Sequence, residues 1–156
     1  MALKKGAFHT AKNTSGDPTL LCVNDDGELL VSSDSPGTCK HDRGTATTTD
    51  AVTFEDTATI TGALTKVYDN FEFSGSSTVE VLWKICYIDD AGGTPVETIL
   101  ADFITGPGQY TVCCNLDCPA VDTTGGTGTQ EFKLKGRSID ASCLGDIFGY
   151  LAVKER

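Results

Sequence analysis

Alternating apolar and polar residues characterise much of the chain after residue 46, and this pattern predicts β-strands. Successive side chains of a strand point to opposite faces. In the stretch 78–88 one face therefore collects Val79, Val81, Trp83, Ile85 and Tyr87. The opposite face mixes polar and apolar residues, which is typical of a strand half covered by a neighbour. The same reasoning predicts further strands at 51–54, 57–60, 63–68, 96–103, 109–116, around 132–134, and at 148–153.

Turn-forming residues separate these segments. Asp89–Gly93, Gly106–Gly108 and the Thr- and Gly-rich stretch 122–130 each interrupt the strand pattern, because Gly, Pro and Asp favour turn conformations. The 17 glycines and the scarcity of helix-forming stretches point the same way. We therefore predict an all-β fold, a β-sandwich or jelly-roll-like domain of about eight antiparallel strands.

The first 45 residues lack this sustained pattern and are predicted to form an irregular N-terminal arm with one β-hairpin. Asp26-Gly27 is a strong two-residue turn signal between the short apolar runs 20–23 and 29–31. A loop around Pro36-Gly37 is expected to follow over 33–45. The predicted organisation is an arm and hairpin at 1–45 and a sandwich domain at 46–156.

The net charge of −10 argues against nucleic-acid binding, because neutralising phosphates requires clustered Lys and Arg. No apolar run in the chain reaches the length of a membrane span or of a secretory signal. We therefore predict neither nucleic-acid nor membrane partners, and synthesis in a cytosol without export by an N-terminal signal.

The residues that could support catalysis or metal binding do not form a recognisable set. Cys114 and Cys118 could supply half of a zinc site, but the pair Cys39 and His41 is too closely spaced for the second half. His9 and His41 both lie in segments expected to be turn-rich. We predict a non-enzymatic protein with no catalytic residue, metal or cofactor.

Adjacent carboxylates occur at 25–26, 55–56 and 89–90, and we interpret them as solvated turn or strand residues. Neighbouring side chains diverge, which is poor geometry for acid–base catalysis and for calcium. A calcium ion in one of these loops stays open as an alternative.

Seven cysteines are unusual for a protein made in a cytosol. Cys113 and Cys114 would point to opposite faces of a strand, so one is expected to pack in the core. Two disulfides are candidates. Cys22 and Cys39 would close a loop of about 18 residues, contributing about 3 kcal/mol if oxidised, and Cys114 could reach Cys118 if the chain turns at 115–117.

The stretch "FEFSGSSTVEVLWKICYIDDAGGTPV" at 71–96 resembles a pattern in small β-sandwich domains of tailed-bacteriophage virion proteins. In those domains a strand flanked by Gly and Ser runs into an Asp-Gly-Gly-Thr turn, and the later "GQYTV" and "FGYLAV" occupy the places of return strands. Such domains seldom carry seven cysteines. The matching positions here are Gly75, Thr78, Val79, Val81, Asp89, Asp90, Gly92, Gly93 and Thr94.

This resemblance implies a virion protein, of the capsid decoration or cement type, that binds and stabilises neighbouring capsid subunits. Its partners would be the major capsid protein or other virion subunits, and it would form a homo-oligomer such as a trimer, assembled in the host cytoplasm. Another virion component (a tail or fibre protein) and a carbohydrate-binding β-sandwich module are the alternatives. The residues expected to contact the partner are Phe8, Leu20, Leu21, Leu29 and Leu30.

Overall fold

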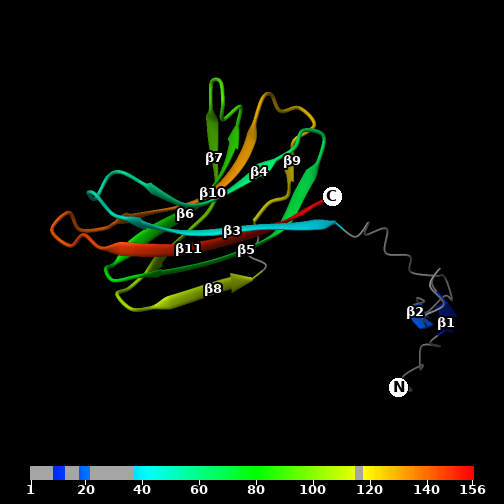
Figure 1. Cartoon of the computed structure of the whole chain (residues 1–156), viewed down its shortest axis with the longest axis horizontal. Helices are drawn as coiled ribbons and strands as arrows, with labels where there is room; N and C mark the ends of the chain where they lie inside the picture. Colours follow the sequence, from blue (N-terminus) through cyan, green and yellow to red (C-terminus); the bar gives the residue numbers. More distant parts are fainter. Residues whose placement is uncertain (1–8, 13–17, 22–36, 115–117) are drawn as a thin grey trace, which may run out of the picture. The chain divides into compact units, whose positions relative to one another are not determined.

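The computed structural model describes residues 9–12, 18–21, 37–114 and 118–156, with the backbone alone for 9–12, 18–21 and 110–114. The chain divides into two compact units, Met1–Ser35 and Pro36–Arg156. Every regular element in the described ranges is a β-strand (Figure 1). A search of these residues finds no helix long and apolar enough to cross a membrane.

The first unit contains a two-stranded antiparallel pair. Strand β1 (His9–Lys12) pairs with β2 (Pro18–Leu21), and Thr10 lies opposite Leu20. Residues 9–12 were expected to be irregular, so this pairing corrects that expectation. Most of the hairpin predicted over 20–31 lies outside the described residues.

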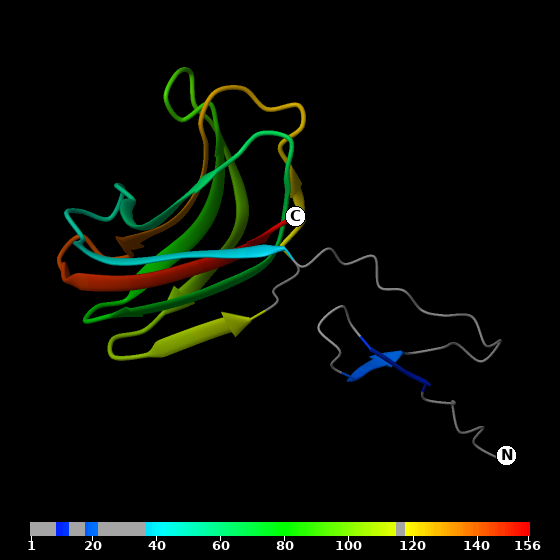
Figure 2. The same ribbon diagram turned by 45° about the vertical axis from the view of Figure 1, so that its right-hand side comes forward.

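The second unit is a sandwich of two antiparallel sheets, which Figures 1 and 2 show as two facing layers. The four-stranded sheet has the order β4 (Glu55–Gly62), β10 (Gln130–Ser138), β6 (Val81–Asp89) and β7 (Val96–Thr105). The other sheet has the order β3 (Thr38–Thr47), β11 (Asp146–Glu155), β5 (Val67–Ser77) and β8 (Tyr110–Cys114), and the short β9 (Val121–Asp122) also pairs with β5. The predicted all-β sandwich of about eight main strands is therefore confirmed.

Three local predictions were wrong. The loop expected at 33–45 contains β3, which pairs with β11 along its whole length. The strand expected at 51–54 is a turn, in which the Asp50 carboxylate accepts hydrogen bonds from the backbone N–H groups of Val52 and Thr53. The strand expected at 63–68 begins only at Val67, because Thr65 has a positive φ of 59°.

The core between the sheets collects the apolar face predicted from the pattern at 78–88. Trp83 is fully buried, and its indole N–H donates a 2.8 Å hydrogen bond to the hydroxyl of Thr105. That bond satisfies the polar end of a side chain whose burial contributes much of the core's stability. The other large core residues are Tyr68, Phe71, Phe73, Val81, Ile85, Phe132, Leu134, Ile147 and Leu151.

Candidate interaction surfaces

The residues predicted to contact a partner fall in the first unit. Leu20 and Leu21 belong to β2, opposite Thr10 and His9. Phe8, Leu29 and Leu30 lie outside the described residues. Their role as a partner interface therefore stays a prediction.

The predicted disulfides also stay predictions. Cys39 is an exposed free thiol on β3, where it lies opposite Lys154. Cys22, its proposed partner, is outside the described residues. Cys114 ends β8 opposite Glu72, and the half-buried Cys118 packs against the core. The expected strand around Cys113 and Cys114 is confirmed as β8.

One lateral side of the sandwich is closed by a seam in which inward-facing residues of β3 meet β4. The ammonium group of Lys40 donates to the backbone oxygen of Thr61 at 3.3 Å. The Asp42 carboxylate accepts a 2.7 Å hydrogen bond from the backbone N–H of Thr59. These two side chains satisfy polar groups on the outer edge of β4, which would otherwise be free to pair with another chain. We call this set of contacts the β3–β4 seam.

Glycines let the two strands of the seam approach each other. Gly44 of β3 lies opposite Gly149 of β11. A Cβ atom on Gly44 would collide with the backbone oxygen of Thr57, and one on Gly149 would lie 2.8 Å from Leu134 Cδ2. Thr57 is buried here and donates a 2.9 Å hydrogen bond to the backbone oxygen of Leu134. The seam thus depends on missing side chains at two paired positions.

At one end of the seam, Lys40 and the buried Tyr68 both bind Glu155, which lies close to the C-terminus in the sequence. Lys40 forms a 2.6 Å ion pair with Glu155, and the Tyr68 hydroxyl donates to the same carboxylate at 2.5 Å. Burial, together with Glu155, raises the pKa of Tyr68 to about 12. Hydrogen bonds from Lys40 and Tyr68 lower the pKa of Glu155. The carboxylate is therefore held in its charged form at neutral pH.

The opposite side of the sandwich is open at β7. This strand pairs with β6 and with no other described strand. Three of its large apolar residues are well exposed: Val96 (60%), Ile99 (59%) and Ile104 (58%). In the part of the chain that the structure describes, no side chain hydrogen-bonds to the free backbone edge of β7, unlike the capped edge of β4. We call β7 and its exposed residues the β7 edge.

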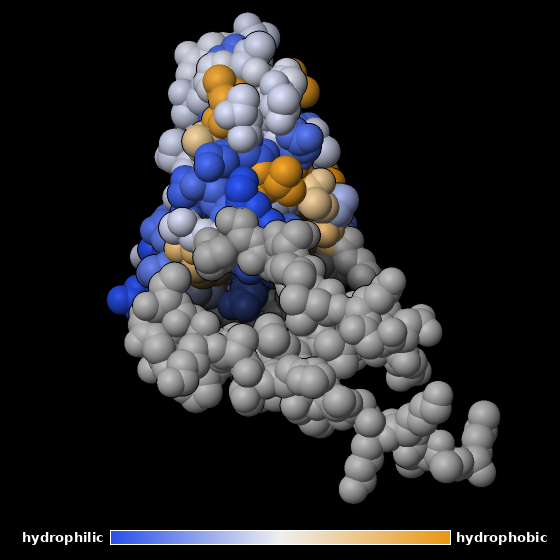
Figure 3. All heavy atoms as spheres, turned by 90° about the vertical axis from the view of Figure 1, so that its right-hand side faces the viewer, coloured by the Kyte–Doolittle hydropathy of each residue, from blue (hydrophilic) through white to orange (hydrophobic). Residues whose placement is uncertain are grey.

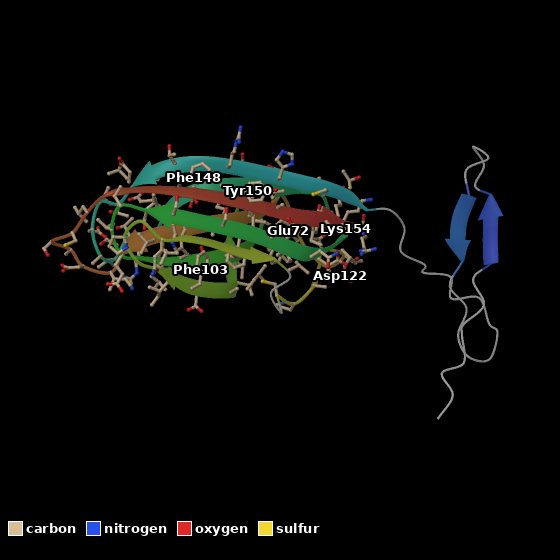
Figure 4. All side chains as sticks on the ribbon, turned by 90° about the horizontal axis from the view of Figure 1, so that it is seen from below. Glu72, Phe103, Asp122, Phe148, Tyr150 and Lys154 are labelled. Carbon is tan, nitrogen blue, oxygen red and sulfur yellow. The ribbon has the colours of Figure 1, made fainter. Side chains whose placement is uncertain are left out.

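Core aromatic side chains extend to this open side. Phe103 of β7 is half-buried and stacks on Trp83 with ring centroids 5.9 Å apart and planes 6° from parallel. Its ring centroid is 4.7 Å from that of Phe73. Figure 4 labels Phe103 on β7. The core is therefore partly exposed along the β7 edge.

A network of ion pairs crosses the outer face of the four-stranded sheet. The Glu97 carboxylate of β7 is bound by Lys84 at 2.5 Å and by Lys135 at 2.7 Å. Burial raises its pKa, but the two lysines outweigh burial and bring the pKa down to about 2. Lys133 binds Asp56 at 2.7 Å on the same face. Glu97 is therefore ionised and already neutralised at neutral pH.

Cys86 lies beneath this network and is not suited to nucleophilic chemistry. It is fully buried, and its thiol lies 3.4 Å from the Glu97 carboxylate. Burial, followed by the nearby Glu97 charge, raises the pKa of Cys86 to about 12. The thiol is therefore protonated at neutral pH, whereas a thiolate is the reactive form.

The adjacent carboxylates Asp89 and Asp90 stabilise turns. Asp89 accepts hydrogen bonds from the Gln130 amide at 2.7 Å and from the Thr127 backbone N–H at 2.8 Å, and these bonds lower its pKa. Asp90, with a positive φ of 53°, accepts from the Thr94 backbone N–H. The turn predicted at 89–93 is confirmed.

No cluster of three metal-ligating residues occurs in the described ranges.

The outer face of the other sheet carries an aromatic pair on β11. Phe148 and Tyr150 are both half-buried and alternate with buried inward residues. In the register, Thr45 and Ser76 flank Phe148, while Arg43 and Ser74 flank Tyr150. Figure 4 shows Phe148, Tyr150 and Lys154 following one another along this strand, with Glu72 on neighbouring β5.

A shallow hollow of about 330 Å³ opens at the Phe148 end of this face. Hydroxyl-bearing residues are prominent in its lining, which consists of Thr45, Ser76, Ser77, Thr78, Gly108, Asp146, Ile147 and Phe148. In the coloured part of Figure 3, apolar residues occur in small groups among hydrophilic ones.

The sandwich resembles chains in two solved structures of infectious bursal disease virus. For the Gt strain, the TM-score is 0.50 at 14% identity, covering 92% of this chain and 41% of that one. For the Gx strain, the TM-score is 0.49 at 14% identity, covering 91% and 39%. The protein thus spans about two fifths of these chains. At this identity the likeness extends to the fold alone.

No protein-family model and no curated protein matches the sequence. The two solved structures come from infectious bursal disease virus and not from a tailed bacteriophage. The Gt-strain match supports the fold, while the resemblance to tailed-bacteriophage proteins stays an expectation.

Sequence reasoning missed both the β3–β4 seam and the β7 edge. The β7 segment was recognised as a strand, but its apolar residues gave no sign of being at an edge. A weak signal for the seam existed in the alternation of Lys40, Asp42 and Gly44. That alternation is polar, so a hydrophobic pattern could not reveal it.

Proposed function

We propose that this protein is a non-enzymatic structural component of a virus particle, a decoration or cement protein that binds and stabilises neighbouring capsid subunits. The observation that carries the proposal is the division into two compact units. The sandwich of residues 36–156 contains the whole described apolar core. We infer that the first unit supplies the element that binds the partner. The fold likeness to chains in virus structures supports the same proposal.

The charge distribution suits this division of roles. The first unit, residues 1–35, carries three lysines, all within residues 4–12, and five acidic residues, a net charge of −2, whereas residues 37–156 carry nine basic and 17 acidic residues, a net charge of −8. The lysines at the start of the chain can contact an acidic surface that the sandwich itself would repel. Leu20 and Leu21, with Phe8, Leu29 and Leu30, would supply the apolar contacts.

Deletion of residues 1–19 tests this proposal. The truncated protein should fold, because every residue of the described core belongs to the sandwich, and it should no longer co-sediment with particles of the source virus. The full-length protein should co-sediment and raise the temperature at which those particles disassemble. Unchanged binding of the truncated protein would exclude the N-terminal unit as the binding element. Absence of full-length protein from purified particles would exclude a virion role.

A carbohydrate-binding module is the second candidate, and one observation favours it. Phe148 and Tyr150 form an aromatic pair flanked by polar residues, with the hollow at one end. Aromatic rings with nearby polar groups are suited to ligands that have both apolar and hydroxyl faces. A glycan array should then give signals that are lost on Tyr150→Ser. A silent array would leave the structural role as the better account.

A further inference from the structure

We propose that the β7 edge is the surface through which two copies of this chain associate, by antiparallel pairing of β7 with β7 of the second copy about a two-fold axis. Edge strands with long, exposed apolar stretches pair readily with other strands. Such an edge in a stable protein is therefore expected to be covered in the functional assembly. A two-fold contact uses the same surface on both copies and closes upon itself.

The β7 edge lacks most devices that keep an edge strand from pairing. It is ten residues long and contains neither lysine nor proline. Its acidic residues are Glu97 and Asp102, and Glu97 is neutralised by Lys84 and Lys135. The one irregularity is a register shift opposite Ile85 and Cys86. By contrast, the edge of β4 is capped through the β3–β4 seam.

Charge favours a second copy as the occupant. Asp102 is exposed and forms no ion pair with the residues that the structure describes. In an antiparallel two-fold pair, the Glu97 end of one β7 lies beside the Asp102 end of the other. The partner's Asp102 then approaches the ammonium groups of Lys84 and Lys135. The arrangement repeats at both ends of the pair, and no unneutralised like charges have to meet.

Apolar contacts complete the surface. Ile99 and Ile104 lie opposite Cys86 and Leu82 of β6 in the register, and each exposes more than half of its surface. With Glu97 opposite Asp102 of the other copy, Ile99 of one copy lies opposite Leu100 of the other, so apolar residues meet at the centre of the pair. Pairing would also cover the half-buried Phe103, where the core reaches the surface. This surface belongs wholly to the sandwich unit.

Sedimentation velocity of the full-length protein over a range of concentrations tests the proposal. The wild type should sediment as a dimer or a larger assembly built on it. Ile99→Lys and Ile104→Lys should each shift it to a monomer, because a lysine on an edge strand opposes pairing. Val52→Lys is the matched control, since Val52 is 81% exposed in the turn at 50–53 and does not belong to β7, and it should leave the sedimentation unchanged. Circular dichroism establishes that each variant is folded.

Hydrogen exchange supplies a second readout. Backbone amides of residues 96–105 should exchange more slowly in the wild type than in Ile99→Lys, and the difference should grow with protein concentration. A wild type that is monomeric at every concentration overturns the proposal. Association that survives both lysine substitutions, or that Val52→Lys abolishes equally, overturns it too. The measurement needs no virus particle, so its outcome is independent of the proposed virion role.

Discussion

The two lateral sides of the sandwich are finished in different ways. On one side, the β3–β4 seam caps the outer edge of β4 with the side chains of Lys40 and Asp42, and paired glycines allow close contact. On the other side, β7 leaves a free backbone edge, exposed isoleucines and a half-buried Phe103. The difference teaches that the same fold can protect one edge within the chain and leave the other for a partner.

The largest expected effect is at the seam, where Gly44→Ala should destabilise the sandwich. The added Cβ would collide with the Thr57 backbone oxygen, so the strand itself has to move. Overpacking of this kind costs about 3 kcal/mol. Chemical denaturation should report that loss, whereas the control Gly125→Ala, which has no atom within 4 Å of its new Cβ, should unfold like the wild type. Equal stability of both variants would mean that the seam is not tightly packed.

On the open side, Phe103→Ala removes the ring between Trp83 and Phe73. A fully buried phenylalanine would cost about 3–5 kcal/mol. Phe103 is half-buried, so about 2 kcal/mol is expected from urea denaturation. Trp83 fluorescence should also shift towards that of a more solvated indole. A loss as large as that of a fully buried ring would show that this side is closed in the protein as purified.

Asp42→Ala tests the cap on the β4 edge. It leaves the backbone N–H of Thr59 without its acceptor, and such a loss costs about 1–2 kcal/mol. Removal of the cap should also expose the edge to pairing, so the variant should aggregate faster on heating than Glu72→Gln, which alters an exposed acid on the other sheet. Light scattering during a thermal ramp measures the difference. If both variants aggregate alike, Asp42 does not protect the edge.

The smallest expected effect concerns acid stability at Glu97. Its pKa is about 2 in the folded protein against an ordinary value of 4.5. Because the folded pKa is depressed, the stabilisation is fully present above about pH 4.5 and is lost as the pH falls towards 2. Since the pair is partly exposed and screened by solvent, its contribution is about 1 kcal/mol. Unfolding measured between pH 6 and 2 should show a weaker acid dependence in Glu97→Gln. An unchanged profile would contradict this assignment.

Sequence reasoning predicted the sandwich because the core strands alternate apolar and polar residues, and this alternation can be read directly from the sequence. Trp83, Ile85 and Phe132 are buried as the alternation indicates. The same reasoning failed where polar side chains hold distant segments together, as in the β3–β4 seam. Asp42 and Lys40 look like loop residues in sequence, and Asp50 and Thr53 form a turn within a segment that reads as a strand. A local pattern cannot report hydrogen bonds between residues that are distant along the chain.

The sequence by itself determined the strand content, the buried face of β6 and the turn at 89–93, because the period of two and turn chemistry are local properties. Only the tertiary structure decided which strands lie at the edges of the sheets. Edge position depends on pairing among segments far apart in the chain, as when β10 comes to lie between β4 and β6. The contrast between the capped edge of β4 and the open edge of β7 therefore became visible only in the fold.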